Sequence, residues 1–357
     1  MMKLIYQIAE RKTLTKAFEW CCKAREEYSA SSDIWILRER WESILPLLQA
    51  QLLAGTYRFS PMEGYVTGAE GSHHFWSATD AVVIKAISLV LTEYLQPKLS
   101  RNCTHIRGNG SMTEALRILR TKISANEFFV RSDIKDYYAS INHKILLQQI
   151  SQLVDESEVL ALIKLSLNRL ELHDGQLVEI RQGIPLRSSL SPLLAAIALN
   201  DLDQAMDKQH ISYVRFMDDW VILAPNRSRL KRYIRLMYQV LNQLKLTVHP
   251  DKTRMGRIAK GIGFLGFILK HEPRLELATV SLQKLYQRIK LILRKKNMSY
   301  ATKHVKLRTY ASHYLGWLRG VSLNWQPLLQ VGKKALITLV NLKYTEGFHN
   351  FLLGNYM

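Results

Sequence analysis

Hydrophobic residues recur along this chain with the spacing of helices in some segments and of strands in others. A first helical segment is predicted over 12–55, where large apolar residues follow near-helical spacing: Trp35, Leu37, Trp41, Ile44, Leu45, Leu48 and Leu52. Further helices are predicted over 78–95, 111–122, 144–170, 191–206 and 227–246. Pro97 ends the first of these, and the remainder of the chain after 269 is expected to be mostly helical.

Short β-rich runs separate these helices. They are predicted over 127–134 and 261–269, in a hairpin over 172–180 around Asp174-Gly175, and in two runs within 211–223. Residues 56–76 alternate like strand and turn. With no internal repeat or low-complexity linker, the pattern predicts an α+β fold in which helices mix with antiparallel strands.

Composition narrows the class of protein. The 357 residues include 50 Lys and Arg against 30 Asp and Glu, a formal net charge of +20. Hydrophobic residues make up 47% of the chain, enough for a sizeable core and too many for a disordered protein. Such a charge excess favours a polyanionic partner, nucleic acid before an anionic membrane.

Membrane, secreted and disulfide-bonded classes fit poorly. The longest clean apolar stretch, 193–199, is far too short to span a bilayer, and residues 1–11 do not form a secretory signal. Cys21, Cys22 and Cys103 form no Cys-x-x-Cys pair, which argues against a disulfide scaffold or a structural zinc site. We therefore expect a cytoplasmic protein with no membrane partner.

The C-terminal quarter concentrates positive charge. From 277 to 345 there is no Asp or Glu, and nine Lys and Arg lie between Lys284 and Arg308. Tyrosines and a tryptophan are interleaved, as in proteins that track a nucleic-acid strand. The alternative is a solvated helix face. The candidate nucleic-acid contacts are Lys284, Arg288, Arg294, Lys295, Lys296 and Lys303.

Two acidic positions carry the candidate chemistry. Asp133 ends the predicted strand 127–134, and Asp218-Asp219 lies between two β-rich runs. An Asp-Asp pair alone is more often an ordinary polar turn. Together, however, these carboxylates form an oxygen-ligand set that suits two Mg²⁺ ions, which promote in-line phosphoryl displacement.

Ordered blocks around these acids resemble reverse transcriptases, especially the bacterial kind related to group II intron-encoded proteins. The blocks are Asp133 to Tyr138, Gln182-Gly183-Ile184-Pro185 with Leu190-Ser191-Pro192-Leu193, Phe216-Met217-Asp218-Asp219, Pro250-Asp251-Lys252-Thr253, Gly263-Phe264-Leu265-Gly266-Phe267, and Tyr314-Leu315-Gly316-Trp317. Each block alone is a weak signal. Their order and spacing carry the resemblance.

The resemblance implies a right-hand polymerase. An N-terminal extension and the fingers would span 1–125, the palm 126–272 with a fingers insertion at about 144–180, and the helical thumb 273–357. The implied activity is RNA-directed DNA polymerisation, which extends a DNA or RNA primer with dNTPs along an RNA template. The implied role is in a retroelement or in a host-adopted process such as phage defence with a non-coding RNA and a partner protein. Only 90 residues follow Phe267, so we expect no endonuclease appendage.

The resemblance also implies roles for single residues. Asp133, Asp218 and Asp219, with the backbone carbonyl of Ile134, would bind two Mg²⁺ ions, for which Mn²⁺ could substitute. Lys252 would protonate the leaving pyrophosphate. The implied contacts to the nucleotide are Lys135, Asp136, Tyr137, Tyr138, Gln182 and Gly183; to the primer, Phe264, Leu265 and Gly266; and to the template, Arg107. Tyr138 would be the steric gate against ribonucleotides, unless it is a core aromatic at a strand–helix corner.

Two departures from the family pattern stand out. Leu186-Arg187-Ser188 replaces the usual second Gln-Gly, and the fingers arginine expected before Asp80 is replaced by Ser72-His73-His74-Phe75. Lys85 or Arg107 could supply the missing positive charge. The histidine pair has no third metal ligand near it in sequence, so no metal site is predicted there. Two other functions stay open: a maturase-like RNA-binding protein that uses the fold as a scaffold, and a two-metal nuclease.

Overall fold

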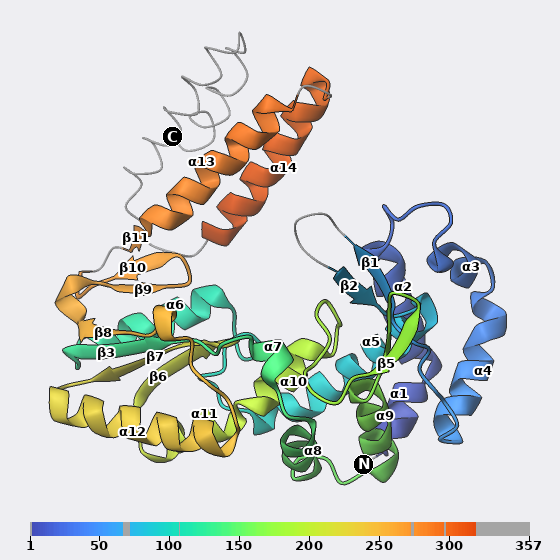
Figure 1. Ribbon diagram of the computed structural model, residues 1–357, viewed down its shortest axis with the longest axis horizontal. Coiled ribbons are helices and arrows are strands. Elements are labelled where there is room, and N and C mark those ends of the chain that lie inside the picture. Colours follow the sequence, from blue (N-terminus) through green and yellow to red (C-terminus); the bar gives the residue numbers. More distant parts are fainter. Residues whose placement is uncertain (1, 67–71, 107, 273–274, 296–297, 319–357) are drawn as a thin grey trace.

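The computed structural model describes residues 2–66, 72–106, 108–272, 275–295 and 298–318 (Figure 1). Within them the chain mixes helices with antiparallel sheets, so the predicted α+β class is confirmed. None of the helices in this described part is long and apolar enough to cross a membrane.

The N-terminal region is a group of helices with one β-hairpin. Its elements are α1 (Leu4–Ala9), α2 (Arg11–Ala24), α3 (Asp33–Glu39), α4 (Trp41–Leu53), β1 (Glu63–Val66), β2 (Ser72–Phe75), α5 (Ala78–Leu95), the 3₁₀ turn η2 (Gln96–Lys98) and α6 (Met112–Ile123). The single helix predicted over 12–55 is wrong, because the chain breaks around Ser29–Ser32 and again at Arg40. Serine favours turns and caps over helix interiors. Leu37, Trp41 and Leu45 still reach one core across the second break, which is why their spacing looked continuous.

A four-stranded antiparallel sheet lies at the centre. Its strands run in the order β6 (Ser212–Phe216), β7 (Asp219–Ala224), β3 (Phe128–Ser132) and β8 (Arg254–Arg257). Alternate residues of β3, β6 and β7 enter different cores: Val130 and Ile222 pack on the side of α12 (Arg227–Gln243), whereas Phe129 and Val221 pack on the side of α6. Figure 1 shows the two helices on opposite faces of the sheet.

Short helices and a second hairpin connect β3 to this sheet's remaining strands. They are α7 (Tyr137–Ser140), α8 (His143–Ser151), α9 (Ser157–Leu167), β4 (Leu170–His173), β5 (Gln176–Glu179), α10 (Ser191–Ala198) and α11 (Asn200–Lys208). The hairpin matches its prediction, but the helices predicted over 144–170 and 191–206 are each two. The first breaks before Glu156, whose carboxylate accepts hydrogen bonds from the amides of Leu4 and Ile5 (2.6 and 3.1 Å). The second bends at Leu199, where no local helix breaker signals the change.

The described C-terminal part begins with small strands and ends with two helices. The elements are η3 (Pro250–Lys252), η4 (Ile258–Lys260), β9 (Ile262–Phe264), β10 (Phe267–Leu269), β11 (Glu276–Leu277), α13 (Thr279–Arg294) and α14 (Tyr300–Leu318). The single strand predicted over 261–269 is a hairpin, because Leu265 and Gly266 both adopt positive φ (49° and 86°), as a tight type I′ turn requires. Apolar residues continue through this two-residue turn, so the sequence pattern did not show that the chain reverses direction there. Helices α13 and α14 pack through a small apolar cluster around Leu285, Ile289 and Leu307.

One ion pair is fully enclosed by this fold. Arg215 on β6 is 0% exposed and donates its Nε to Oδ1 of Asp203 on α11 at 2.8 Å. The same carboxylate oxygen accepts a hydrogen bond from the Tyr213 hydroxyl (2.8 Å). The guanidinium also donates to the carbonyls of Ala196 and Met217, so its charge is well compensated.

We expect Asp203→Ala to lower the free energy of unfolding by roughly 3–5 kcal/mol, because it leaves the buried Arg215 without a counter-charge. Urea denaturation of the purified protein measures this. The double variant Asp203→Leu/Arg215→Met removes both charges and should recover most of the loss. A single variant as stable as the parent would contradict this account.

Candidate active site

The sheet brings the three predicted acids to one end. Ser132, the last residue of β3, pairs with Trp220, and Phe216 pairs with Asp219 across the β6–β7 hairpin. Asp133 follows Ser132 directly, so it lies beside Asp219, with Asp218 in the two-residue turn between β6 and β7. A strand end and a hairpin turn thus form one carboxylate cluster.

Two polar side chains, the half-buried His105 and the buried Arg215, hold the turn that carries Asp218. Met217 has a left-handed backbone (φ 57°), and its N–H donates to Nδ1 of His105 at 3.0 Å. Its carbonyl accepts from Arg215 at 2.7 Å. The other nitrogen of His105, Nε2, lies 3.2 Å from the Pro192 carbonyl, which only accepts, so the proton resides on Nε2 and the imidazole is neutral. Burial, reinforced by the Arg215 charge, lowers the pKa of His105 to about 3.

Two of the acids have basic partners. Arg131 on β3 grips Asp219 with a two-pronged contact, Nε to Oδ1 at 2.8 Å and Nη2 to Oδ2 at 2.6 Å. Lys252 binds Oδ2 of Asp133 at 2.7 Å. Burial raises the pKa of both Asp218 and Asp219, and the charge of Asp133 adds to the rise at each. The hydrogen bond to Asp133 raises the pKa of Lys252, which keeps it an ammonium ion.

The donor set fits a divalent cation. Oδ1 of Asp133 is buried and has no hydrogen-bond partner among the described residues. Burial raises the pKa of Asp218 and the nearby charge of Asp133 adds to the rise, a repulsion that a bound cation would relieve. Ile134, the next residue, is 2% exposed and packs its side chain in the hydrophobic core, and the role of its carbonyl as a ligand stays a prediction. Asp219 differs, because Arg131 engages both of its oxygens.

The residues expected around the nucleotide divide into buried and accessible ones. Tyr137 is buried and its hydroxyl donates to the Ala195 carbonyl, whereas Tyr138 is only partly buried. Asp136 takes a left-handed backbone (φ 48°) at the start of α7. The amide of Lys135 donates to the Thr247 carbonyl at 2.9 Å, which ties its backbone to a neighbouring segment, and its contact with the nucleotide stays a prediction.

Gly183 allows two backbone segments of this chain to approach closely, rather than the chain and a nucleotide. A Cβ at this position (φ 83°) would lie 2.9 Å from the Tyr138 carbonyl oxygen and 3.0 Å from Cα of Ala139. Ile184 N–H then donates to that same Tyr138 carbonyl at 2.8 Å. Gln182 is exposed, and its side-chain amide donates to the Ser140 carbonyl at 3.0 Å. The block therefore supports the segment that carries Tyr138.

The hairpin expected to grip the primer lies beside the acids. Nη1 of Arg131 donates to the Gly263 carbonyl at 2.7 Å, so one side chain joins this hairpin to Asp219. Phe264 is 0% exposed and serves the core, whereas Leu265 and Gly266 form the partly buried turn. The Gly266 carbonyl accepts hydrogen bonds from the amide of Ala278 and the hydroxyl of Ser281, which anchors the start of α13.

The predicted basic contacts have mixed placements. Lys284, Arg288, Arg294 and Lys295 are exposed on or directly after α13, but Lys303 is buried. Arg107 and Lys296 lie outside the described residues. The Lys85 ammonium sits over the Trp20 ring at 4.3 Å, on the N-terminal helices, which makes it a poor substitute for the missing fingers arginine.

Sequence reasoning missed Arg131, His105 and Arg215. A signal existed for Arg131, since period-2 alternation places it on the same face as Asp133. Nothing local connects His105 to the turn, from which it is 112 residues distant in sequence. Arg215 is only two residues from Met217, but the β pattern around it does not show that its side chain folds back to the Met217 carbonyl.

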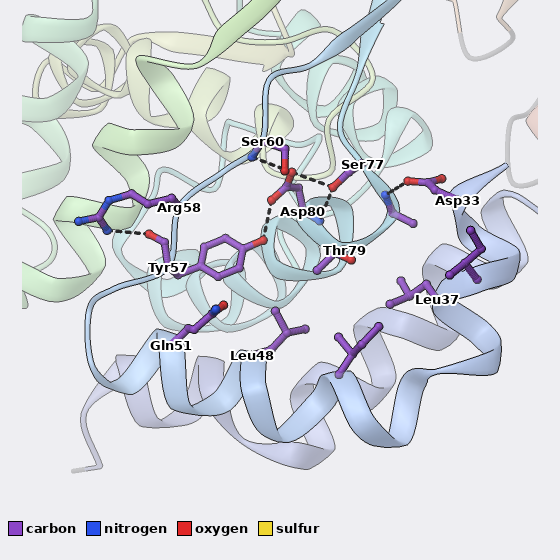
Figure 2. Close-up of a pocket in the computed structure, with 13 residues that line it drawn as sticks. Asp33, Leu37, Leu48, Gln51, Tyr57, Arg58, Ser60, Ser77, Thr79 and Asp80 are labelled. Carbon is purple, nitrogen blue, oxygen red and sulfur yellow. Dashed lines mark hydrogen bonds between the residues drawn. The ribbon is translucent and has the colours of Figure 1, made fainter.

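A separate pocket of about 450 Å³ lies among α3, α4 and the start of α5 (Figure 2). Its lining includes none of Asp133, Asp218 and Asp219. Asp80 there accepts hydrogen bonds from Tyr57, Ser60 and Ser77 at 2.6, 3.1 and 2.7 Å. Both of its oxygens are therefore occupied, and the network fixes the start of α5.

Comparison with known proteins identifies the family. A family model described as reverse transcriptase (RNA-dependent DNA polymerase) matches residues 76–269, more than half of the chain. The chain belongs to the reverse transcriptase family. The resemblance to bacterial group II-like reverse transcriptases is thereby confirmed, as are the polymerase fold and the enzyme class. The matched segment contains all three acids, and members of this family use divalent metal ions.

Individual relatives of this reverse transcriptase are distant. Protein YkfC of Escherichia coli is 19% identical over 275 residues, which cover 65% of this chain and 72% of YkfC. Group II intron-encoded protein LtrA of Lactococcus lactis is 26% identical over 168 residues, 46% of this chain but 28% of LtrA. An uncharacterized 91 kDa protein in the cob intron of Schizosaccharomyces pombe is 28% identical over 131 residues, 37% of this chain and 16% of that protein. A solved Cas6-RT-Cas1–Cas2 complex contains a chain 21% identical, with a TM-score of 0.42, covering 68% of this chain and 42% of that one.

The neutral His105 predicts a pH dependence. The folded pKa of about 3 is below the usual value of about 6.5, so only the unfolded chain takes up this proton as the pH falls between those values. Stability from His105 is full above pH 6.5 and declines toward pH 3, by up to about 1.4 kcal/mol per pH unit. The advantage of the parent over His105→Gln should therefore shrink between pH 7 and 5 in urea titrations. Parallel stability curves for the two proteins would show that the ring is not held neutral.

Proposed function

We propose that this reverse transcriptase is an RNA-directed DNA polymerase that extends a primer 3′ end with dNTPs by two-metal nucleotidyl transfer. The observation that carries the proposal is the cluster of Asp133, Asp218 and Asp219, in which a buried Asp133 oxygen has no hydrogen-bond partner in the described part of the chain. A protein that only bound RNA would gain nothing from crowding three acids, since their repulsion costs stability.

In this proposal Asp133 and Asp218, with the Ile134 carbonyl, hold two Mg²⁺ ions, and Mn²⁺ substitutes for them. When bound, such ions stabilise the attacking and leaving oxygens of the phosphoryl displacement. Arg131 keeps Asp219 fixed beside them and orients the Gly263 hairpin, which binds the primer. Lys252 contacts Asp133 through a side chain that is about half exposed. Its ammonium group carries the proton that the leaving pyrophosphate takes up.

Tyr138 is the proposed steric gate. Its side chain is partly exposed, its pKa is raised by burial and by the charge of Asp218, and the Gly183 approach fixes its backbone. Its ring therefore lies within electrostatic reach of the acids, where a nucleotide sugar would rest. The core alternative describes its neighbour Tyr137 better.

The proposed domains follow from this assignment. Residues 126–272 form the palm around the four-stranded sheet, 1–125 with the insertion at about 144–180 form the fingers, and 273–357 form the thumb. The insertion hairpin β4–β5 hydrogen bonds to Met62 beside β1, which supports its place in the fingers. Lys284 and Arg288 lie one turn apart on the exposed face of α13, and the exposed Lys295 directly follows the helix, an arrangement suited to the phosphates of a template–primer duplex.

The biological role follows from the template. Two relatives are named for introns, which favours a retroelement RNA; host defence with a non-coding RNA and a partner protein is the other role we propose. Sequencing the RNA that copurifies with the protein, together with the DNA it makes, separates these roles.

Asp218→Asn should reduce primer extension on an RNA template by at least roughly 10³-fold, because the transition-state charge loses its stabilisation. Asp251→Asn, an exposed acid beside Lys252, is the matched control and should keep full activity. Circular dichroism confirms that both fold. Undiminished extension by Asp218→Asn would refute the metal assignment, and RNA binding without extension by the parent would favour a maturase-like function.

Tyr138→Val should raise ribonucleotide incorporation relative to deoxynucleotide incorporation by about tenfold or more, since the smaller side chain leaves room for a 2′-hydroxyl. Single-nucleotide extension with matched rNTP and dNTP series measures the ratio. Tyr137→Phe loses only a buried hydroxyl and should leave the ratio unchanged. If both variants discriminate as the parent does, Tyr138 is not the gate.

A further inference from the structure

Three metal-ligating side chains meet between the two hairpins of the proposed fingers. His74 lies on β2, whereas Glu171 and His173 lie on β4, about 100 residues later in the chain. Nδ1 of His74 is 3.4 Å from Oε2 of Glu171, and Nε2 of His173 is 3.2 Å from the same oxygen. One donor atom from each residue lies within 4.8 Å of the others. The third ligand that sequence spacing could not supply is therefore present.

The hydrogen bonds behind the cluster fix how each ligand presents its lone pair. Nε2 of His74 is 3.1 Å from the Leu172 carbonyl, which only accepts, so Nε2 carries the proton in the neutral ring. Nδ1 then points a lone pair at a carboxylate oxygen, an arrangement that needs a cation or an extra proton between them. Metal-bound histidines commonly donate their other nitrogen to a backbone carbonyl in this way.

Glu171 is oriented by a second contact. Its Oε1 accepts from Nε of Arg169 at 2.7 Å, and both side chains are at most 10% exposed. Oε2 is left facing the two imidazoles. By holding one carboxylate oxygen, the buried arginine fixes the orientation of the other, as hydrogen bonds behind metal ligands commonly do.

The backbone makes room for this geometry. Gly64 on β1 pairs directly with His74, and a Cβ there would lie 2.9 Å from His74 Nε2 and 3.3 Å from the Leu172 carbonyl oxygen. The two hairpins are also joined by backbone hydrogen bonds, from Met62 N–H to Leu170 and from Leu172 N–H to Met62 (2.8 and 3.0 Å). Figure 1 shows them side by side.

We propose that His74, Glu171 and His173 bind a Zn²⁺ ion that joins the β1–β2 hairpin to the β4–β5 hairpin. Two imidazoles and one carboxylate suit Zn²⁺ and leave a fourth position for water. The side chain of His173 is 43% exposed, which gives the ion a path from solvent. Imidazole ligands disfavour Mg²⁺, so the site is chemically distinct from the aspartate cluster. The cysteines, on which we based the expectation of no structural zinc, take no part.

The test is a Zn²⁺ titration of the full-length, chelator-treated protein in millimolar Mg²⁺, which occupies the aspartates. We expect one equivalent of Zn²⁺ by calorimetry and a rise in the melting temperature that depends on Zn²⁺ concentration. His173→Ala, at a partly exposed position that should not disturb folding, should weaken the Zn²⁺ affinity by about 100-fold or more. His271→Ala removes an exposed histidine elsewhere and should change nothing.

Two further outcomes make the result decisive. Asp218→Asn should bind Zn²⁺ as the parent does, so loss of polymerase activity and loss of zinc binding are separable. If the parent takes up no Zn²⁺, or if His173→Ala binds it with the parent's affinity, the cluster is only an ion pair of protonated histidines with Glu171, and the proposal is wrong.

Discussion

Repulsion among three carboxylates at one end of the central sheet is the constraint to which the surrounding structure responds. Three positively charged side chains nearby offset this repulsion or fix the site in different ways. Arg131 holds Asp219 with two parallel hydrogen bonds and has a third for the Gly263 carbonyl. Lys252 meets Asp133 with a side chain 54% exposed, so that contact breaks easily. Arg215 is fully buried and pairs with Asp203 rather than with these three carboxylates. It donates to the Met217 carbonyl and so fixes the turn that presents Asp218. The site thus combines one rigid acid, one acid whose partner can leave, and one rigid turn.

Shared hydrogen bonds also join the proposed fingers to the segment that carries Tyr138. The Gly183 carbonyl accepts from Nε2 of His143 and from Nη1 of Arg169, at 2.8 and 3.1 Å. Gly183 in turn packs against the backbone of Tyr138 and Ala139. Arg169 therefore contacts both Glu171 of the histidine cluster and the glycine that supports the proposed gate. Lysine could not replace it, because a single ammonium lacks the fork that reaches a carboxylate and a carbonyl together.

The sequence predicted what local patterns encode. Acids at a strand end and in a hairpin turn were visible because alternation locates strands, and the ordered blocks gave the family. Helix breaks at Arg40 and Leu199 were not, since apolar residues on both sides serve one core and keep their spacing. Met217 and Leu265 adopt left-handed backbones that their residue types do not indicate. The His74 cluster was invisible for a different reason: its ligands come from two hairpins that meet only in the folded chain.

The two proposed cation sites have unlike ligands, which would keep two kinds of cation apart on one basic protein. The aspartates, with the carbonyl proposed as a further ligand, would make a hard oxygen site, which suits Mg²⁺ and tolerates its retained water. Imidazoles with one fixed carboxylate make a borderline site, which Mg²⁺ satisfies poorly and Zn²⁺ well. Geometry reinforces the difference, because Glu171 has one oxygen committed to Arg169, whereas Asp133 keeps an oxygen with no partner among the described residues. A cation at the hairpins would therefore act on the fingers' packing, and a cation at the aspartates on the reaction.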